Sequence, residues 1–413
     1  MIYGIAEIIL LGFIIEWVLS RFRIPGLTGM LIAGVIIGPY TYDLISSEVS
    51  HVSYDLRMFA LIVILLRAGL ELSWKALSSV GRRAVLMSFI PCSLEIIAIT
   101  FAAKYFLSLS YIESAILGSV LGAVSPAVVV PFMIKFIKEG KGSDKHIPTL
   151  VLAGASIDDT IAIVLCAAFT KIYTGNSVSF LSELSHIPVS VITGILTGLV
   201  SGIVLYRIFD RFSPRDTKKT IIFLIASVFL FHSEKIISNI FPFSALIAIM
   251  SIGFITLEKR EHFAHRISAK LGKLWVPAHI LLFVLVGAEV NPAISLKTGF
   301  SGLFVIAVGL FGRSMGVLLC LIKSNLNIRE RLFCVISYIP KATVQAAIGV
   351  LPLNAMRAAG MNTIPGDIIL SVAVTSILFT APIGSLLIEY AGSRLLRNEK
   401  TGKDEIEAAL ESN

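Results

Sequence analysis

Two adjacent carboxylates stand in the middle of an apolar stretch of the sequence. Asp158 and Asp159 lie within GASIDDTIAI, where most other residues are small or aliphatic. A carboxylate buried in a membrane costs about 2.5–3.5 kcal/mol on insertion scales, and two neighbouring ones repel each other unless a cation or a proton is present. Desolvation favours the protonated form, so such a group can exchange a proton for a metal cation. The pair is therefore predicted to bind a metal cation in competition with protons.

Two other apolar stretches are interrupted by proline near their centres. The first contains Ser125-Pro126 in GAVSPAVVVP, and the second contains Pro340-Lys341 in PKATVQAAIGV. Proline removes a backbone donor and disturbs the preceding helical turn. Carbonyls freed at a break can coordinate a cation, and the ends of the half-helices need compensating charge. Ser125 and Lys341 are therefore predicted to belong to the ion site. Further candidate neighbours are Pro126, Thr343 and Gln345.

Other charges lie singly inside apolar stretches. Glu95 and Arg313 can satisfy each other as a buried ion pair, and Arg313 can alternatively pair with Asp158. Lys341 can neutralise one of the carboxylates or the dipole ends of the broken helix that contains it. The four cysteines show neither CxxC spacing nor a nearby histidine at ligand spacing, so neither a disulfide framework nor a zinc site is indicated. No cofactor is expected beyond the transported ions.

The elements that position these residues are transmembrane helices. Of the 413 residues, 56% are hydrophobic and 15% are charged, with a mean hydropathy of +0.87. Ordinary soluble domains have about 25% charged residues, so a soluble enzyme or a disordered chain is excluded. Thirteen apolar stretches are long enough to span a bilayer. They are 2–20, 24–40, 57–73, 84–106, 112–134, 148–171, 187–207, 219–237, 242–258, 274–290, 299–322, 331–352 and 365–391.

The basic residues between these stretches alternate between the two sides of the membrane. Of the 35 lysines and arginines, 26 fall in the loops and tail of one side and six on the other. The six are Arg57, Lys104, Lys171, Lys235, Lys297 and Arg357. The positive-inside rule places the N-terminus outside and the C-terminus in the cytoplasm, in a multi-pass protein of the inner membrane. The net charge of +8 thus reflects topology rather than nucleic-acid binding.

The chain also contains a weak internal repeat. Pro126 and Pro340 are 214 residues apart, and Glu95 and Arg313 are 218 apart. Each pair is separated by an odd number of spans, so the two copies insert in opposite directions, as in many secondary transporters. The predicted fold is an all-α polytopic membrane protein with 13 transmembrane helices, arranged as two inverted six-helix repeats with crossed discontinuous helices.

With these motifs in place, the chain resembles the sodium/proton antiporters of the cation–proton antiporter superfamily. It is most similar to the NHA branch, in its bacterial type. The resemblance covers nearly the whole chain and rests on three motifs, at 122–131, 154–163 and 340–350. It implies exchange of Na⁺ or Li⁺ for protons, a homodimer in membrane lipid and an elevator-like alternating-access motion of a core domain.

The resemblance also implies a division of the chain into domains. The dimerisation domain would comprise 1–83 and 219–298, the core ion-transport domain 84–172 and 299–393, a linker helix 173–218, and a short cytoplasmic tail 394–413.

Residue roles follow from the same resemblance. Asp159 matches the main ion and proton carrier, Asp158 the first aspartate, and Lys341 the lysine of the second crossover. Glu95 and Arg313 match a core salt bridge. Many electrogenic relatives have a lysine at the position of Arg313, so the stoichiometry stays open between electrogenic and electroneutral exchange.

Three alternatives can be weighed from the sequence. A K⁺/H⁺ exchanger of the same superfamily stays open, because cation selectivity depends on carbonyl placement and cavity size. A bile-acid-type symporter shares the broken-helix plan but lacks an Asp-Asp pair inside a helix. An intramembrane aspartyl protease needs aspartates on two separate helices, and Asp55 and Asp367 lie only at span ends. The chain is therefore expected not to be an enzyme.

Overall fold

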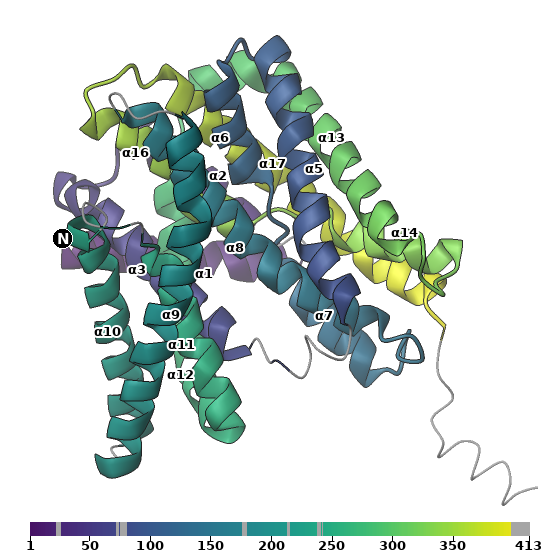
Figure 1. Cartoon of the computed structure of the whole chain (residues 1–413). Coiled ribbons are helices and arrows are strands. Elements are labelled where there is room, and N and C mark those ends of the chain that lie inside the picture. Colours follow the sequence, from purple (N-terminus) through teal and green to yellow (C-terminus); the bar gives the residue numbers. More distant parts are fainter. Residues whose placement is uncertain are drawn as a thin grey trace, which may run out of the picture.

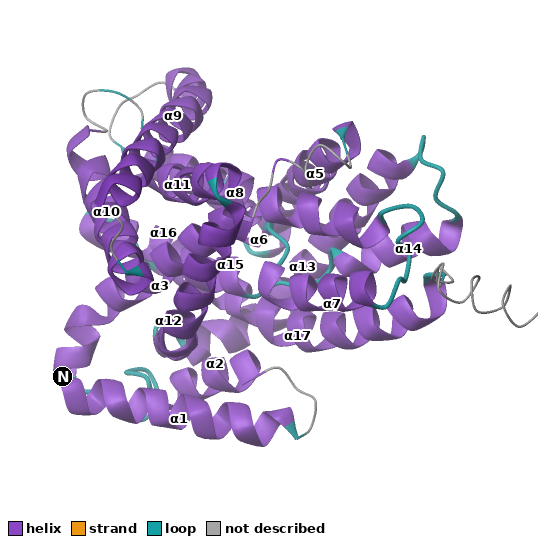
Figure 2. Cartoon of the chain, turned by 90° about the horizontal axis from the view of Figure 1, so that it is seen from below, coloured by secondary structure: helices purple, strands orange, loops and turns teal. Residues whose placement is uncertain are grey.

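A computed structural model describes residues 1–21, 26–71, 74, 81–175, 180–212, 215–237, 241 and 243–397. In these residues the regular structure consists of helices and contains no strand (Figure 2). The helices are α1 (Ile2–Ser20), α2 (Gly26–Ile37), α3 (Ser47–Glu71), α5 (Arg82–Phe106), α6 (Tyr111–Leu121), α7 (Pro126–Lys138), α8 (Ile147–Thr174), α9 (Phe180–Phe212), α10 (Asp216–Ile237), α11 (Ala245–Lys259), α12 (Glu261–Ala288), α13 (Pro292–Leu321), α14 (Ile328–Ser337), α15 (Thr343–Ile348), α16 (Leu351–Ala358) and α17 (Ile364–Leu395).

Each predicted span coincides with a helix or with a set of shorter helices. Among the described residues, seven helices are long and apolar enough to cross a membrane, so the count of 13 crossings stays a prediction. Large apolar side chains are exposed on the outer helices, for example Phe300 and Phe311 on α13 and Phe229 on α10. Exposed large apolar side chains are expected where a helix faces lipid.

Several helices begin well before the predicted spans. Helix α3 starts at Ser47 rather than at 57, and α12 starts at Glu261 rather than at 274. Hydropathy detects only the apolar part of a helix, whereas the backbone hydrogen bonds continue through its polar ends. Arg57, which the sequence places at the outer end of the span 57–73, therefore lies well inside the helix. Arg57 is 1% exposed within α3, and its guanidinium lies 3.3 Å from Glu289, the residue directly after α12.

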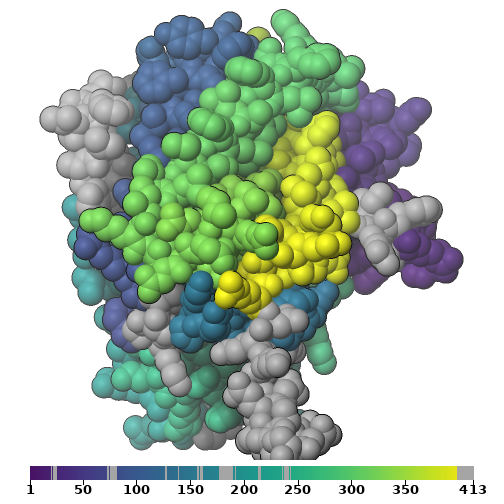
Figure 3. All heavy atoms as spheres, turned by 90° about the vertical axis from the view of Figure 1, so that its right-hand side faces the viewer, coloured from purple at the N-terminus to yellow at the C-terminus, as the bar shows by residue number. Residues whose placement is uncertain are grey.

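The helices pack in two groups that lie side by side (Figure 1). In one group, α3 packs against α11 and α12, α2 packs against α12, and α9 packs against α11. In the other, α5 packs against α6, α8 and α13, and α17 packs against α13 and α14. Figure 3 shows the outer face of this second group, where α13, α14 and α17 lie together.

Close glycine contacts hold the first group together. Gly69 on α3 and Gly253 on α11 lie so near the facing backbone that a Cβ atom at either position would overlap it. Small residues let transmembrane helices approach closely, and the approach maximises van der Waals contact where no hydrophobic driving force acts between helices.

The second group contains both interrupted spans. Helix α6 ends at Leu121 and α7 begins at Pro126, while α14 ends at Ser337 and α15 begins at Thr343. The first half-helix of each span opens with the same capping box. Ser110 and Glu113 cap α6, and Asn327 and Glu330 cap α14, 217 residues later. The caps thus occur at the spacing of the internal repeat, and the predicted all-helical fold with crossed discontinuous helices is confirmed.

Candidate functional site

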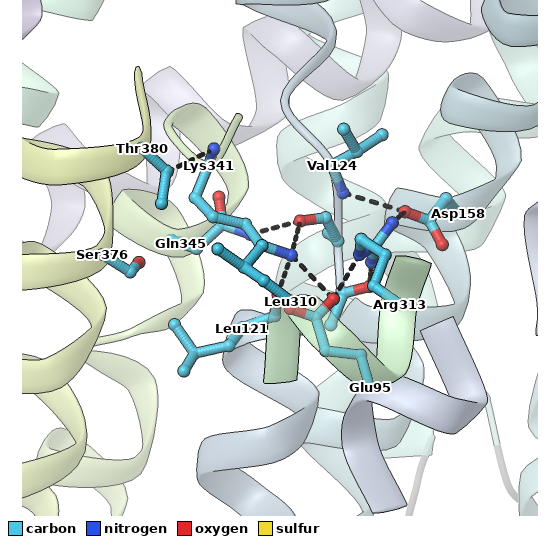
Figure 4. A network of polar contacts seen from close by, with 12 residues as sticks. Glu95, Leu121, Val124, Asp158, Leu310, Arg313, Lys341, Gln345, Ser376 and Thr380 are labelled. Carbon is cyan, nitrogen blue, oxygen red and sulfur yellow. Dashed lines mark hydrogen bonds and ion pairs between the residues drawn. The ribbon is translucent and has the colours of Figure 1, made fainter. Parts of the chain in front are cut away.

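The two breaks meet in the interior of the second helix group (Figure 4). The backbone N–H of Ser125, in the first break, donates to the carbonyl oxygen of Pro340, in the second, at 2.8 Å. The side-chain amide of Gln345 donates to the carbonyl oxygen of Ala123 at 2.8 Å. The extended segments between the half-helices are therefore joined to each other.

Lys341 neutralises the end of helix α6. Its ammonium group donates to the carbonyl oxygens of Leu121, at 2.6 Å, and Ala123, at 3.0 Å. It also lies 2.7 Å from Glu95 on α5, and the side chain is only 1% exposed. The last carbonyls of a helix lack partners within the helix and carry partial negative charge, which a buried ammonium group offsets.

Arg313 on α13 joins the carboxylates of two other helices. Its Nε donates to Glu95, one Nη donates to Asp158 at 3.0 Å, and the other Nη donates to the carbonyl oxygen of Gly122. The two pairings that the sequence left as alternatives therefore occur together. The guanidinium is 2% exposed, so these ion pairs form away from water.

Asp158 on α8 is fully buried. Its Oδ2 atom accepts hydrogen bonds from Arg313 and from the backbone N–H of Val124, at 2.8 Å. Its Oδ1 atom has no hydrogen-bond partner among the described residues, and neither has the Oγ atom of Ser125. Asp159 follows on the same helix, but its side chain lies outside the described residues, as does that of Pro126. The role of Asp159 in ion binding stays a prediction.

The site contains groups that the sequence interpretation missed. The N–H of Val124 and the carbonyl of Gly122 both bind charged side chains, although neither residue type suggests a site. The break itself was the available signal, because every interruption of a helix frees backbone groups. Lys341 also contacts Glu95 and carbonyl groups, whereas no bond between Lys341 and Asp158 occurs in the described structure.

A cavity reaches the first residues of α15, which directly follow the second break. It has a volume of about 210 Å³ and lies between α3, α12 and the broken helices, with Thr343 and Pro131 in its lining. Arg67 and Glu71 on α3 also line it and form an ion pair of 2.9 Å. Both side chains are partly exposed.

Comparison with known proteins gives a consistent result. Residues 8–390 match the family described as "Sodium/hydrogen exchanger, transmembrane". Human sodium/hydrogen exchanger 9B2 is 37% identical over 402 residues, which cover 92% of the chain and 72% of the human protein. Human sodium/hydrogen exchanger 9B1 is 32% identical over 390 residues, covering 90% and 73% respectively.

The fold is also similar to that of a solved structure. The sodium proton antiporter MjNhaP1 from Methanocaldococcus jannaschii superposes with a TM-score of 0.81. The similarity covers 95% of the chain and 98% of MjNhaP1 at 20% sequence identity, so it concerns the fold.

Proposed function

The chain belongs to the sodium/hydrogen exchanger family, and we propose that Asp159, with Asp158, carries the ions that it exchanges. The protein is an integral membrane antiporter that exchanges Na⁺ for protons. This family is one of transporters, and the crossed broken helices are the type of site that secondary transporters use near the bilayer midplane.

The observation that carries the proposal is the charge balance of the buried network. Glu95 and Asp158 contribute two negative charges, and Arg313 and Lys341 contribute two positive ones. Buried charges are tolerated only when they are compensated. Asp159 adds a further carboxylate to the same helix, so its charge needs a partner from outside the network. A proton or a Na⁺ ion can each supply that single positive charge, and the two would bind in alternation.

Transport further requires that the site face each side of the membrane in turn. We assign this motion to the helix group of α5–α8 and α13–α17, moving as an elevator-like core against α1–α3 and α10–α12. Both breaks and all four charged residues of the network lie in that group. The proposal includes a homodimer in which the other group forms the interface. It also includes an inner-membrane location with the N-terminus outside and the C-terminus in the cytoplasm.

Reconstituted vesicles test the ion-carrier assignment. Purified protein is placed in liposomes that contain a pH-sensitive dye, and Na⁺, Li⁺ or K⁺ is added outside. The wild-type protein should move protons in response to Na⁺ or Li⁺, and Asp159→Asn should abolish the response. Asp43→Asn is the matched control, because Asp43 lies in the loop after α2 and asparagine tolerates its positive φ of 48°.

Two outcomes would contradict the proposal. A normal response in Asp159→Asn would remove Asp159 from the carrier role. A response to K⁺ alone would identify a potassium/proton exchanger instead. Repeating the assay with a membrane potential set by valinomycin shows whether net charge moves in each cycle.

A further inference from the structure

One buried polar group of the second break takes no part in the network. Tyr338 is 0% exposed, yet in the described structure its hydroxyl group has no hydrogen-bond partner. A buried hydroxyl group without a partner costs about 1–3 kcal/mol. Phenylalanine would fill the same space without that cost, so the hydroxyl group calls for an explanation.

The position of Tyr338 relates it directly to the charged residues. It follows the last residue of α14, two residues before Pro340. The centre of its ring lies 5.8 Å from the guanidinium carbon of Arg313, within the range of a cation–π contact. The ring therefore lies against the same guanidinium group that holds Asp158.

The hydroxyl group of Tyr338 points at helix α8. It lies against Gly154, where a Cβ atom would overlap it. Helical side chains lean toward the N-terminus of the helix and cover the preceding turn. Asp158 is four residues after Gly154, so its carboxylate leans toward the turn that the Tyr338 hydroxyl contacts.

Two other buried oxygen atoms in this region are also without partners among the described residues. They are Oδ1 of Asp158 and Oγ of Ser125. With Tyr338, the oxygen atoms without a partner near the ion pairs are thus a carboxylate oxygen, a serine hydroxyl and a phenol hydroxyl. In selective ion sites, protein oxygen atoms replace the hydration shell of an alkali cation. Hard cations bind carboxylate and other oxygen ligands.

We propose that Tyr338 is a cation-binding residue, whose hydroxyl oxygen coordinates the transported Na⁺ together with Oδ1 of Asp158. The inference rests on the proposed function, because it adds a ligand to the same ion site. A metal cation needs several oxygen ligands, whereas a proton needs only one acceptor. An added neutral oxygen therefore strengthens the binding of a cation more than the binding of a proton. Tyr338 therefore favours cation binding without adding a charge that must be compensated.

The test compares Tyr338→Phe with the wild-type protein in the proteoliposome assay. The substitution keeps the ring against Arg313 and removes only the oxygen. We expect the KM for Na⁺ to rise roughly five- to tenfold while the maximal rate changes less than twofold. Stabilisation of the purified protein by Na⁺, measured as a shift in melting temperature, should decrease in parallel. Ser114→Ala is the control, because Ser114 is another buried hydroxyl group without a partner in the described chain, on α6 and outside the site.

A second variant tests the geometry. Gly154→Ala places a methyl group where the Tyr338 hydroxyl lies, and should raise the KM for Na⁺ by a similar factor. In the double variant with Tyr338→Phe the methyl group meets no hydroxyl, so the two effects should not add.

The outcomes separate the inference from the proposed function. If the wild-type protein gives no response to Na⁺ or Li⁺, the proposed function fails. If the wild-type protein responds and Tyr338→Phe keeps the wild-type KM, only the role of Tyr338 is overturned. A Tyr338→Phe variant that loses maximal rate at unchanged KM would likewise overturn it, since a ligand must act on binding.

Discussion

The two breaks share a scaffold but differ in their chemistry. Both follow a half-helix that opens with a capping box. A proline follows directly after the first break, as Pro126, and another lies within the second, as Pro340. The first break, at 122–125, contributes only backbone groups and one hydroxyl, whereas the second contributes Lys341. The same asymmetry extends to the flanking helices. The carboxylates Glu95 and Asp158 come from the first repeat, and the cations Arg313 and Lys341 come from the second.

This difference shows which features the two copies of an inverted repeat can have in common and which they cannot. The local rules for starting and interrupting a helix are equivalent in both copies, so caps and prolines recur. Charges cannot recur, because two copies of the same sign would repel each other in a buried site. The repeats are therefore complementary, and neither would be neutral on its own.

The strongest way to break the complementarity is Arg313→Ala. It removes the cation that joins both carboxylates of the first repeat and leaves two buried negative charges with one positive charge. Breaking a buried ion pair costs about 3–5 kcal/mol, so we expect a large loss of folded yield and of melting temperature in detergent. Glu95→Ala should lower folded yield in the same way. A stable Arg313→Ala or Glu95→Ala protein that cannot transport would instead show a direct role in ion movement.

Lys341→Met should have a smaller effect. Glu95 keeps Arg313 as a partner, and the carbonyl of Ala123 keeps Gln345, but the carbonyl of Leu121 loses the ammonium group. We expect a loss of about 1–3 kcal/mol, measured by thermal unfolding. Lys341→Arg keeps the charge and is the control. A destabilisation as large as that of Arg313→Ala would contradict the expectation that Lys341 contributes less to stability than Arg313.

Substitutions in the two capping boxes should have the smallest effects, and they test directly whether the two repeats share the same scaffold. Ser110→Ala and Asn327→Ala each remove the side chain that accepts from the third residue of a half-helix. Each should cost about 1 kcal/mol. We expect the two losses of melting stability to agree within about 0.5 kcal/mol. A clear inequality would show that the repeats differ in scaffold as well as in charge.

Much of this arrangement could be predicted from residue types. Prolines in apolar stretches located both breaks, and the rarity of buried charges singled out Glu95, Arg313 and Asp158. What the sequence did not reveal are contacts made by backbone atoms. The N–H of Val124 and the carbonyl of Gly122 have no residue-type signature, and they bind charges only because the chain is extended there.

Burial was the second property that residue types did not predict. Arg57 was placed at the outer end of its predicted span, because a charge next to an apolar stretch normally marks its end. In the fold it is buried, and Glu289, directly after α12, compensates its charge. Tyr338 was missed for the opposite reason, since a tyrosine in an apolar stretch is ordinary until its hydroxyl group proves to lack a partner.

The bond from Ser125 to Pro340 joins the breaks through main-chain atoms alone. Of all substitutions at these two positions, only proline at 125 would remove a participating group, because the carbonyl of residue 340 is present whatever its side chain. The crossing is thus largely independent of the side chains that surround it. Single substitutions can therefore change the charges and hydroxyl groups of the site, and hence its ion selectivity. The main-chain bond that joins the two breaks stays unchanged.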